Sequence, residues 1–169
     1  MNRIFEESGI KFDFSSCGIT QKFDTNTYSG LKAVDFISET DDCLYFIEVK
    51  NYQHPQAPLE NKEKDYQMLI DAGTTSDTSV FNLEMGAKIK DSLLRQYASG
   101  CNFNKKVIYL LVIHLTKLGE FERGMLKTKI LGHVPIGLND TTFCKFKEIS
   151  FEVTDIAQLG QYGIACTEI

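Results

Sequence analysis

The chain has 169 residues, of which 43% are hydrophobic and 24% are charged, so it is long enough for one domain with its own hydrophobic core. Its net charge of −5 counts against a protein that coats nucleic acid through a uniformly basic surface. A narrow basic rim or a carboxylate cluster loaded with metal is still compatible with a polyanionic ligand. The longest apolar run, "VIYLLVIHL" from Val107, is about half as long as a membrane-spanning helix, so we expect no membrane segment.

The cysteines are scattered, odd in number and without a C-x-x-C pair, which predicts reduced and mostly buried thiols. The N-terminal stretch "MNRIFEESG" lacks the apolar region of a signal peptide. Together these features predict a cytoplasmic protein without disulfide bonds or a zinc site. The cysteines are Cys17, Cys43, Cys101, Cys144 and Cys166.

The first third of the chain predicts a short helix followed by strands. The amphipathic pattern of residues 2–8 indicates a helix with Ile4 and Phe5 turned inward. Alternating apolar residues then predict strands, and polar turn sequences separate them. The predicted strands cover residues 11–14, 19–25, 31–37 and 43–52.

The rest of the chain alternates between helical and strand patterns. We expect helices at 60–71, 83–98 and 119–131, a doubly buried strand at 106–114 and a further strand at 145–153, while the tail from Asp155 has no clear pattern. No internal repeat or domain boundary interrupts this order. It predicts a single α/β domain spanning 1–169, with a mixed central sheet flanked by helices.

The segment "YFIEVKNY" from Tyr45 carries two opposite charges on one face of a strand. Side chains alternate along a strand, so Glu48 and Lys50 point the same way, with Cα atoms roughly 6.5–7 Å apart. Burying either charge alone is costly, so each needs a partner, a metal or an open cleft. Asp35 interrupts the apolar run of the preceding predicted strand, and a hairpin between the two strands would bring it to Glu48 beside Lys50.

These three residue types suit phosphoryl chemistry. The carboxylates of Asp35 and Glu48, with the main-chain carbonyl of Val49, provide the oxygen ligands that Mg²⁺ or Mn²⁺ prefers. The ammonium of Lys50 can stabilise negative charge that builds on a phosphate. The alternative interpretation is that Glu48 and Lys50 form a plain ion pair on an exposed sheet.

The stretch "VDFISETDDCLYFIEVK" resembles the core of the PD-(D/E)xK nuclease superfamily, which has the restriction-endonuclease-like fold. Asp35 matches the first acid of the motif, Glu48 the second and Lys50 the lysine, whereas Val34 replaces the proline. The resemblance covers roughly residues 2–115 and implies an αβββαβ core. It also implies a further metal-binding acid on the first helix, for which Glu6 is the candidate and Glu7 the alternative.

The predicted helix from Leu83 offers groups for substrate contact. Lys88 and Ser92 lie on a polar stripe beside its apolar face, together with Arg95, and Gln96 falls within the apolar face itself. Similar nucleases use this helix to reach the scissile phosphate, which makes Lys88, Ser92 and Gln96 candidate substrate-binding residues. The alternative is a solvated flank with one satisfied buried amide.

The resemblance implies a metal-dependent nuclease that hydrolyses phosphodiester bonds in nucleic acid, with DNA as the favoured substrate. It also implies that the protein can pair as a homodimer. The alternative is a catalytically silent binding or scaffold module with the same fold. Retention of an acid–acid–lysine set favours the enzyme, because a scaffold has no need for three costly charges at one cleft.

Overall fold

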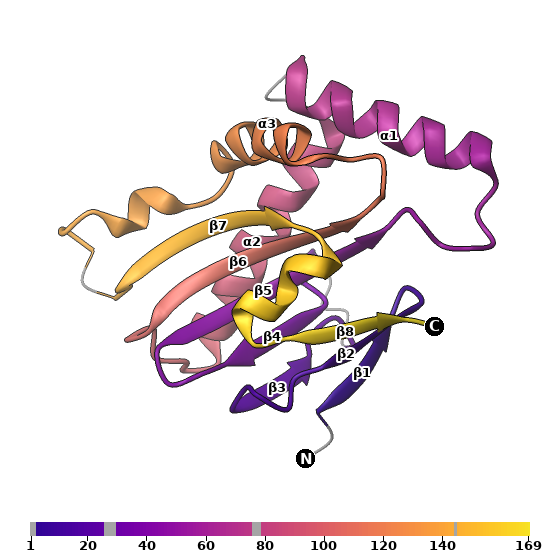
Figure 1. Ribbon diagram of the computed structural model, residues 1–169. Coiled ribbons are helices and arrows are strands. Elements are labelled where there is room, and N and C mark those ends of the chain that lie inside the picture. The colour runs from indigo at the N-terminus through magenta and orange to yellow at the C-terminus, as the bar shows by residue number, and fades with distance from the viewer. Residues whose placement is uncertain (1–2, 26–29, 76–78, 144) are drawn as a thin grey trace.

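The computed structural model describes residues 3–25, 30–75, 79–143 and 145–169, and is built around a mixed five-stranded sheet (Figure 1). Its strand order is β3-β4-β5-β6-β7. The first three strands pair antiparallel, and the last three pair parallel. Their bounds are β3 (Ile19–Lys22), β4 (Phe36–Glu39), β5 (Cys43–Asn51), β6 (Lys106–His114) and β7 (Glu148–Thr154).

A smaller antiparallel sheet has the order β1-β2-β8 and joins the two ends of the chain. The helix predicted for residues 2–8 is wrong over its described part, because Ile4 to Glu7 form a strand and Asn2 lies outside the described residues. A two-residue turn at Ser8 and Gly9, with φ of 53° and 75°, closes this strand into a hairpin. The strands are β1 (Ile4–Glu7), β2 (Ile10–Asp13) and β8 (Ala165–Glu168).

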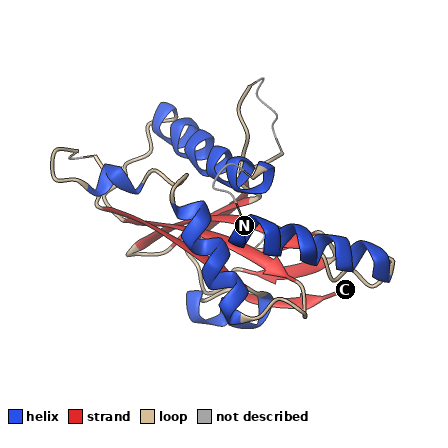
Figure 2. Cartoon of the chain, turned by 90° about the horizontal axis from the view of Figure 1, so that it is seen from above, coloured by secondary structure: helices blue, strands red, loops and turns tan. Residues whose placement is uncertain are grey.

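Three α-helices cover one face of the central sheet, and the small sheet lies against the other face (Figures 1 and 2). The predicted α/β class with a mixed sheet flanked by helices is therefore confirmed, although the α-helices of the described residues lie on one face only. A 3₁₀ helix, η2 (Ile156–Tyr162), completes the second face, and η1 (Ile136–Asn139) precedes β7. The α-helices are α1 (Leu59–Thr74), α2 (Val80–Ala98) and α3 (Glu120–Leu131).

Two buried clusters follow from this arrangement. On the helix face, Phe46 and Tyr109 of the sheet pack with Ile89 of α2. On the opposite face, Phe36 packs with Phe12 of the small sheet, their ring centroids 5.5 Å apart. The central strands are thus buried on both sides, which explains the continuously apolar sequence of β6.

Strand β4 begins five residues later than the sequence predicts. The backbone N–H of Lys32 donates to Asp91 Oδ2 at 2.9 Å, and that of Val34 donates to Ser92 Oγ at 3.0 Å. Side chains of α2 therefore hold the backbone N–H groups of Lys32 and Val34, while the carbonyl of Asp35 accepts a hydrogen bond of 2.7 Å from the backbone N–H of Phe23, directly after β3. This attachment fixes the chain directly before Asp35.

The structure also bears on the predicted absence of a membrane segment and of disulfide bonds. Within the described residues, none of the helices is long and apolar enough to cross a membrane. Four cysteines, Cys17, Cys43, Cys101 and Cys166, are free thiols, but only Cys17 is buried, so the prediction of mostly buried thiols is wrong for the other three. Cys144 lies outside the described residues.

Candidate active site

Asp35 lies immediately before β4 and is only 6% exposed. Its Oδ2 accepts a hydrogen bond of 2.6 Å from the backbone N–H of Val49. The antiparallel β4–β5 ladder ends with Phe36 opposite Ile47, so the next position places Asp35 across from Glu48. The hairpin predicted from the sequence is confirmed, and it brings both acids to the same end of the sheet.

Glu48 is the most deeply buried charged side chain of this site, at 1% exposure. Its Oε1 contacts Lys88 Nζ of α2 at 2.6 Å and Lys50 Nζ at 3.0 Å. Its Oε2 is also buried, and no described residue forms a hydrogen bond with it. One oxygen of Glu48 is thus neutralised twice, while the other is buried without a hydrogen-bond partner among the described residues.

Burial and mutual repulsion disturb the protonation of both acids. Burial raises the pKa of Asp35 to about 7, and the nearby charge of Glu48 adds to this; the hydrogen bond from Val49 and the ammonium of Lys88 oppose it. Burial also raises the pKa of Glu48, against the opposing effect of Lys88 and Lys50. Burial alone would lower the pKa of Lys88, but the carboxylate of Glu48 outweighs it and raises that pKa. Two acids with this cost of ionisation are typical of a functional site.

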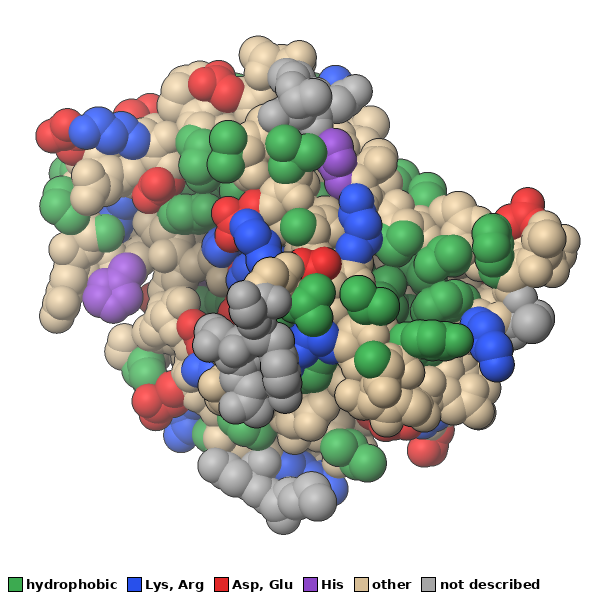
Figure 3. Space-filling model, turned by 180° about the vertical axis from the view of Figure 1, so that it is seen from behind, with side chains coloured by type: hydrophobic (Ala, Val, Ile, Leu, Met, Phe, Trp, Pro, Cys, Tyr) green, Lys and Arg blue, Asp and Glu red, His purple; other side chains and the backbone are tan. Residues whose placement is uncertain are grey.

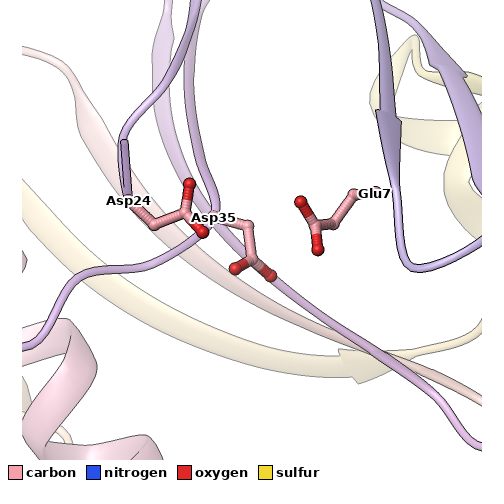
Figure 4. Close-up of side chains that lie close together, drawn as sticks. All are labelled: Glu7, Asp24 and Asp35. Atoms are coloured by element: carbon pink, nitrogen blue, oxygen red, sulfur yellow. The ribbon is translucent and has the colours of Figure 1, made fainter. Parts of the chain in front are cut away.

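Two further carboxylates approach Asp35 from other elements (Figure 4). Ligand atoms of Glu7 in β1, Asp24 after β3 and Asp35 all lie within 4.8 Å of one another. Glu7 also pairs with Lys22 Nζ at 2.7 Å, and the Oδ1 of Asp24 is buried without a hydrogen bond from any described residue. The small sheet and the central sheet therefore both contribute acids to one site.

Of the two acids considered in the N-terminal segment, Glu7 reaches the site and Glu6 does not. Because residues 4–7 form a strand, neighbouring side chains point to opposite faces. Glu6 is exposed and lies opposite Lys11 in the β1–β2 ladder, outside the acidic cluster. The alternative that the sequence left open, Glu7, is the residue that the structure brings to Asp35.

The three residues expected on α2 have different positions. Lys88 enters the site through its contact with Glu48. Ser92 is fully buried, and its Oγ holds the backbone N–H of Val34, so it positions the chain before Asp35. Gln96 lies further along the helix and lines a cavity next to the site.

The site is bordered by two cavities. One, of about 600 Å³, is lined by Lys22, Arg95 and Gln96 among others. The second, of about 420 Å³, includes Lys50 and Tyr52 in its wall. Lys22, which pairs with the half-buried Glu7, and Lys50, which pairs with the buried Glu48, thus also face open space, where an anionic ligand could be bound.

The residues at this site fit a hard divalent cation. All the free ligand atoms are carboxylate oxygens, and two of them, Glu48 Oε2 and Asp24 Oδ1, are buried without a hydrogen bond from the described residues. The N–H and C=O of one strand residue point to the same side, so the carbonyl of Val49 faces the side on which its N–H meets Asp35. Asp35, Glu48 and this carbonyl, which are the ligands predicted from the sequence, lie at the same end of the sheet, and Glu7 and Asp24 approach Asp35.

Asp24 and Lys22 were not predicted, although the sequence contains a signal for them. They stand two residues apart in the segment 19–25, so an extended chain turns both toward one face. Glu48 and Lys50 have the same spacing of acid and base. A search for such alternating pairs on every predicted strand would have found both.

Comparison of the chain with protein-family models, curated proteins and solved structures gave no match in any of the three.

Proposed function

We propose that this protein is a metal-dependent nuclease that hydrolyses phosphodiester bonds, with DNA as its substrate. The observation that carries the proposal is the burial of Asp35 and Glu48 beside Lys50 and Lys88, with one oxygen of Glu48 buried and without a hydrogen bond from the described residues. Such a group of charges is costly to assemble, and a cation between the carboxylates would offset much of that cost.

Asp35, Glu48 and the carbonyl of Val49 would hold Mg²⁺ or Mn²⁺, with Glu7 and Asp24 as the nearest further ligands. When bound, such a cation polarises a phosphoryl oxygen and lowers the pKa of a coordinated water. The hydrogen bond from Val49 to Asp35 fixes the orientation of that carboxylate. Ser92 restrains the preceding backbone, so the acid is held on rigid elements.

Lys50 and Lys88 would act on the substrate phosphate. Both ammonium groups meet at one oxygen of Glu48, and both side chains are partly exposed, at 25% and 16%. A phosphate entering from the cavity beside Lys50 would receive hydrogen bonds from an ammonium that is already positioned. This donor stabilises the charge that increases on the phosphate oxygens as the bond to the leaving oxygen breaks.

The experiment is cleavage of plasmid DNA, single-stranded DNA and RNA in Mg²⁺ or Mn²⁺, with and without EDTA. We expect metal-dependent cleavage by the parent protein and its loss in Asp35→Asn and Glu48→Gln. Glu39→Gln is the matched control, because Glu39 also pairs with a lysine at 2.7 Å but lies at the other end of β4. No cleavage of any substrate by the parent, or equal activity in all variants, would contradict the proposal. Cleavage of RNA alone would correct the substrate.

A second candidate is a binding or scaffold module without catalysis. The observation that favours it is that Glu48 Oε1 already has two lysine partners, which is also how a structural ion-pair cluster is built. This candidate predicts that Glu48→Gln and Lys50→Ala both destabilise the fold, and that divalent metal changes the stability of neither variant nor the parent.

A further inference from the structure

Helix α2 has three different faces. One is buried against the sheet through Met85, Ile89 and Leu93. A second, which includes Lys88, turns to the candidate active site. The third is exposed to solvent and is nevertheless mainly apolar, and only its edge residues Val80 and Leu94 also line the cavities beside the site.

The residues of this third face alternate by three and four positions along the helix, so they form one continuous strip. Four large apolar side chains on it are strongly exposed: Val80 at 81%, Leu83 at 48%, Leu94 at 54% and Tyr97 at 55%. We call these residues the α2 strip, together with the half-buried Ala87 and the exposed Lys90.

Figure 3, which views the molecule from the side of α2, shows hydrophobic side chains gathered over one half of this surface. Leu94 and Tyr97 also line an apolar groove of about 310 Å³, whose other wall includes Leu138 and Phe146. An apolar surface of this extent, on a 19-residue helix, is typical of a protein interface.

We propose that the α2 strip is a dimer interface, on which a second copy of this chain packs its own α2 strip antiparallel across a two-fold axis. The alternation by three and four residues is the pattern by which two long helices pack side by side. A two-fold contact requires a surface that is complementary to itself, and the α2 strip meets this requirement. The inference does not depend on the proposed nuclease activity.

The strip matches itself when the two helices run in opposite directions. If Leu83 faces Leu94 of the second copy, then Ala87 faces Lys90 of the second copy. The only charged member of the strip then meets its smallest member, so the lysine stem can cross the contact and leave its ammonium in water. In a parallel pair, Lys90 would face Lys90, which is unfavourable.

Charges at the edge of the strip agree with the antiparallel arrangement. Glu84 and Arg95 lie on the same edge of α2, and the guanidinium of Arg95 is held over the ring of Phe23 at 4.0 Å. In the alignment that joins Leu83 to Leu94, Glu84 of one copy and Arg95 of the other differ by about 3 Å along the helix axis. Two such opposite-charge pairs, related by the two-fold axis, would flank the apolar contact.

Sedimentation equilibrium over protein concentrations from about 5 to 500 µM tests the proposal. The contact is small, so we expect a dissociation constant on the order of 10 µM and a mass that rises from one chain to two. Leu94→Glu should keep the protein monomeric throughout, because it places a carboxylate in the apolar contact. Phe121→Glu is the matched control, since Phe121 on α3 is 75% exposed and lies off the strip; it should dimerise like the parent.

Further variants test the register. Lys90→Leu should strengthen dimerisation by at least about tenfold, because it completes the apolar strip. When the Leu83→Cys and Leu94→Cys proteins are mixed and oxidised, a disulfide should join one variant to the other through the two introduced thiols, while neither variant alone should link to itself through its introduced thiol. A parent that stays monomeric at every concentration would overturn the proposal, as would a dimer insensitive to Leu94→Glu or a Leu83→Cys protein that links to itself through the introduced thiol.

Discussion

The two ends of the central sheet use the same charged residue types in different ways. At the end where β4 and β5 join, Glu39 pairs with Lys105 at 2.7 Å and Lys106 pairs with Glu148 at 2.8 Å, and all four side chains are between 26% and 49% exposed. At the other end, Asp35 and Glu48 are 6% and 1% exposed. Charges are paired one to one in water at the first end and are crowded in the protein interior at the second.

This difference separates an ordinary surface from a candidate site. Exposed ion pairs contribute little to stability and need no further explanation. We call the end of the sheet with Asp35 and Glu48 the buried end. It holds four carboxylates and three lysines, and two of the carboxylate oxygens are buried without a hydrogen bond from the described residues. Burying unpaired carboxylate charge is costly in the absence of a ligand, and a bound cation would offset that cost. The four carboxylates belong to Glu7, Asp24, Asp35 and Glu48, and the three lysines are Lys22, Lys50 and Lys88.

The largest difference between the two ends should be seen in catalysis. We expect Lys50→Ala to lower the rate of metal-dependent DNA cleavage by a factor of about 10²–10³, because one preorganised charge donor is lost. Lys105→Ala removes a lysine that also pairs with a glutamate, and should stay within about twofold of the parent. Single-turnover cleavage assays measure both. Equal rate losses in the two variants would remove the distinction between the ends.

The pH dependence of stability should differ next. The pKa of Asp35 is raised to about 7 in the fold from 3.8, so its contribution to stability is fully present below pH 4 and is lost as the pH rises through 7. Without metal, Asp35→Asn should therefore become more stable than the parent above pH 7, by a few kcal/mol. Denaturant unfolding of both proteins at pH 5 and pH 8 measures this, and an unchanged difference between the two pH values would contradict the burial of an ionised Asp35.

Metal should stabilise the buried end only, and more strongly at higher pH. Binding to the native state requires an ionised Asp35, so we expect 10 mM Mg²⁺ to raise the melting temperature by on the order of 5 °C at pH 8 and by less at pH 6. Glu39→Gln should retain this increase, whereas Glu48→Gln should lose it. A rise that is the same in Glu48→Gln would place the cation elsewhere.

The smallest expected effect is on stability, when an ion pair at the exposed end of the sheet is removed. Removing the Glu39–Lys105 pair by Glu39→Gln should cost less than about 1 kcal/mol in the free energy of unfolding, because both side chains are solvated. Urea unfolding at low and high salt would show a small difference that salt reduces further. A loss of several kcal/mol would mean that this pair is a structural element comparable to Glu48.

Much of the buried end could be predicted from the sequence because it depends on local periodicity. Alternation in two neighbouring strands was sufficient to place Asp35 near Glu48 and to put Lys50 beside them. The four-residue spacing on the helix similarly placed Lys88 on a polar stripe, and the structure brings it to Glu48. The place of Lys88 on its helix follows from that spacing, whereas its contact with Glu48, 40 positions away in the sequence, depends on the packing of α2 against the sheet.

The remaining acids depend on tertiary packing, which periodicity does not describe. Glu7 reaches Asp35 only because β1 joins a sheet with β8 from the other end of the chain and this sheet packs on the central one. The segment around Glu7 is short and amphipathic enough to suggest a helix, and the turn at Ser8 and Gly9 was the local sign of a hairpin. The late start of β4 has the same origin, since side chains of α2 capture its backbone.

The most direct test of the candidate site is a crystal structure with Mn²⁺, with the ion located by its anomalous scattering. We expect a peak about 2.0–2.6 Å from carboxylate oxygens of both Asp35 and Glu48, with Glu48 Oε2 among the ligands. Crystals soaked at high Mn²⁺ that show no peak at these two acids, while Lys50 and Lys88 still share Glu48 Oε1, would contradict the metal site and favour a structural ion-pair cluster.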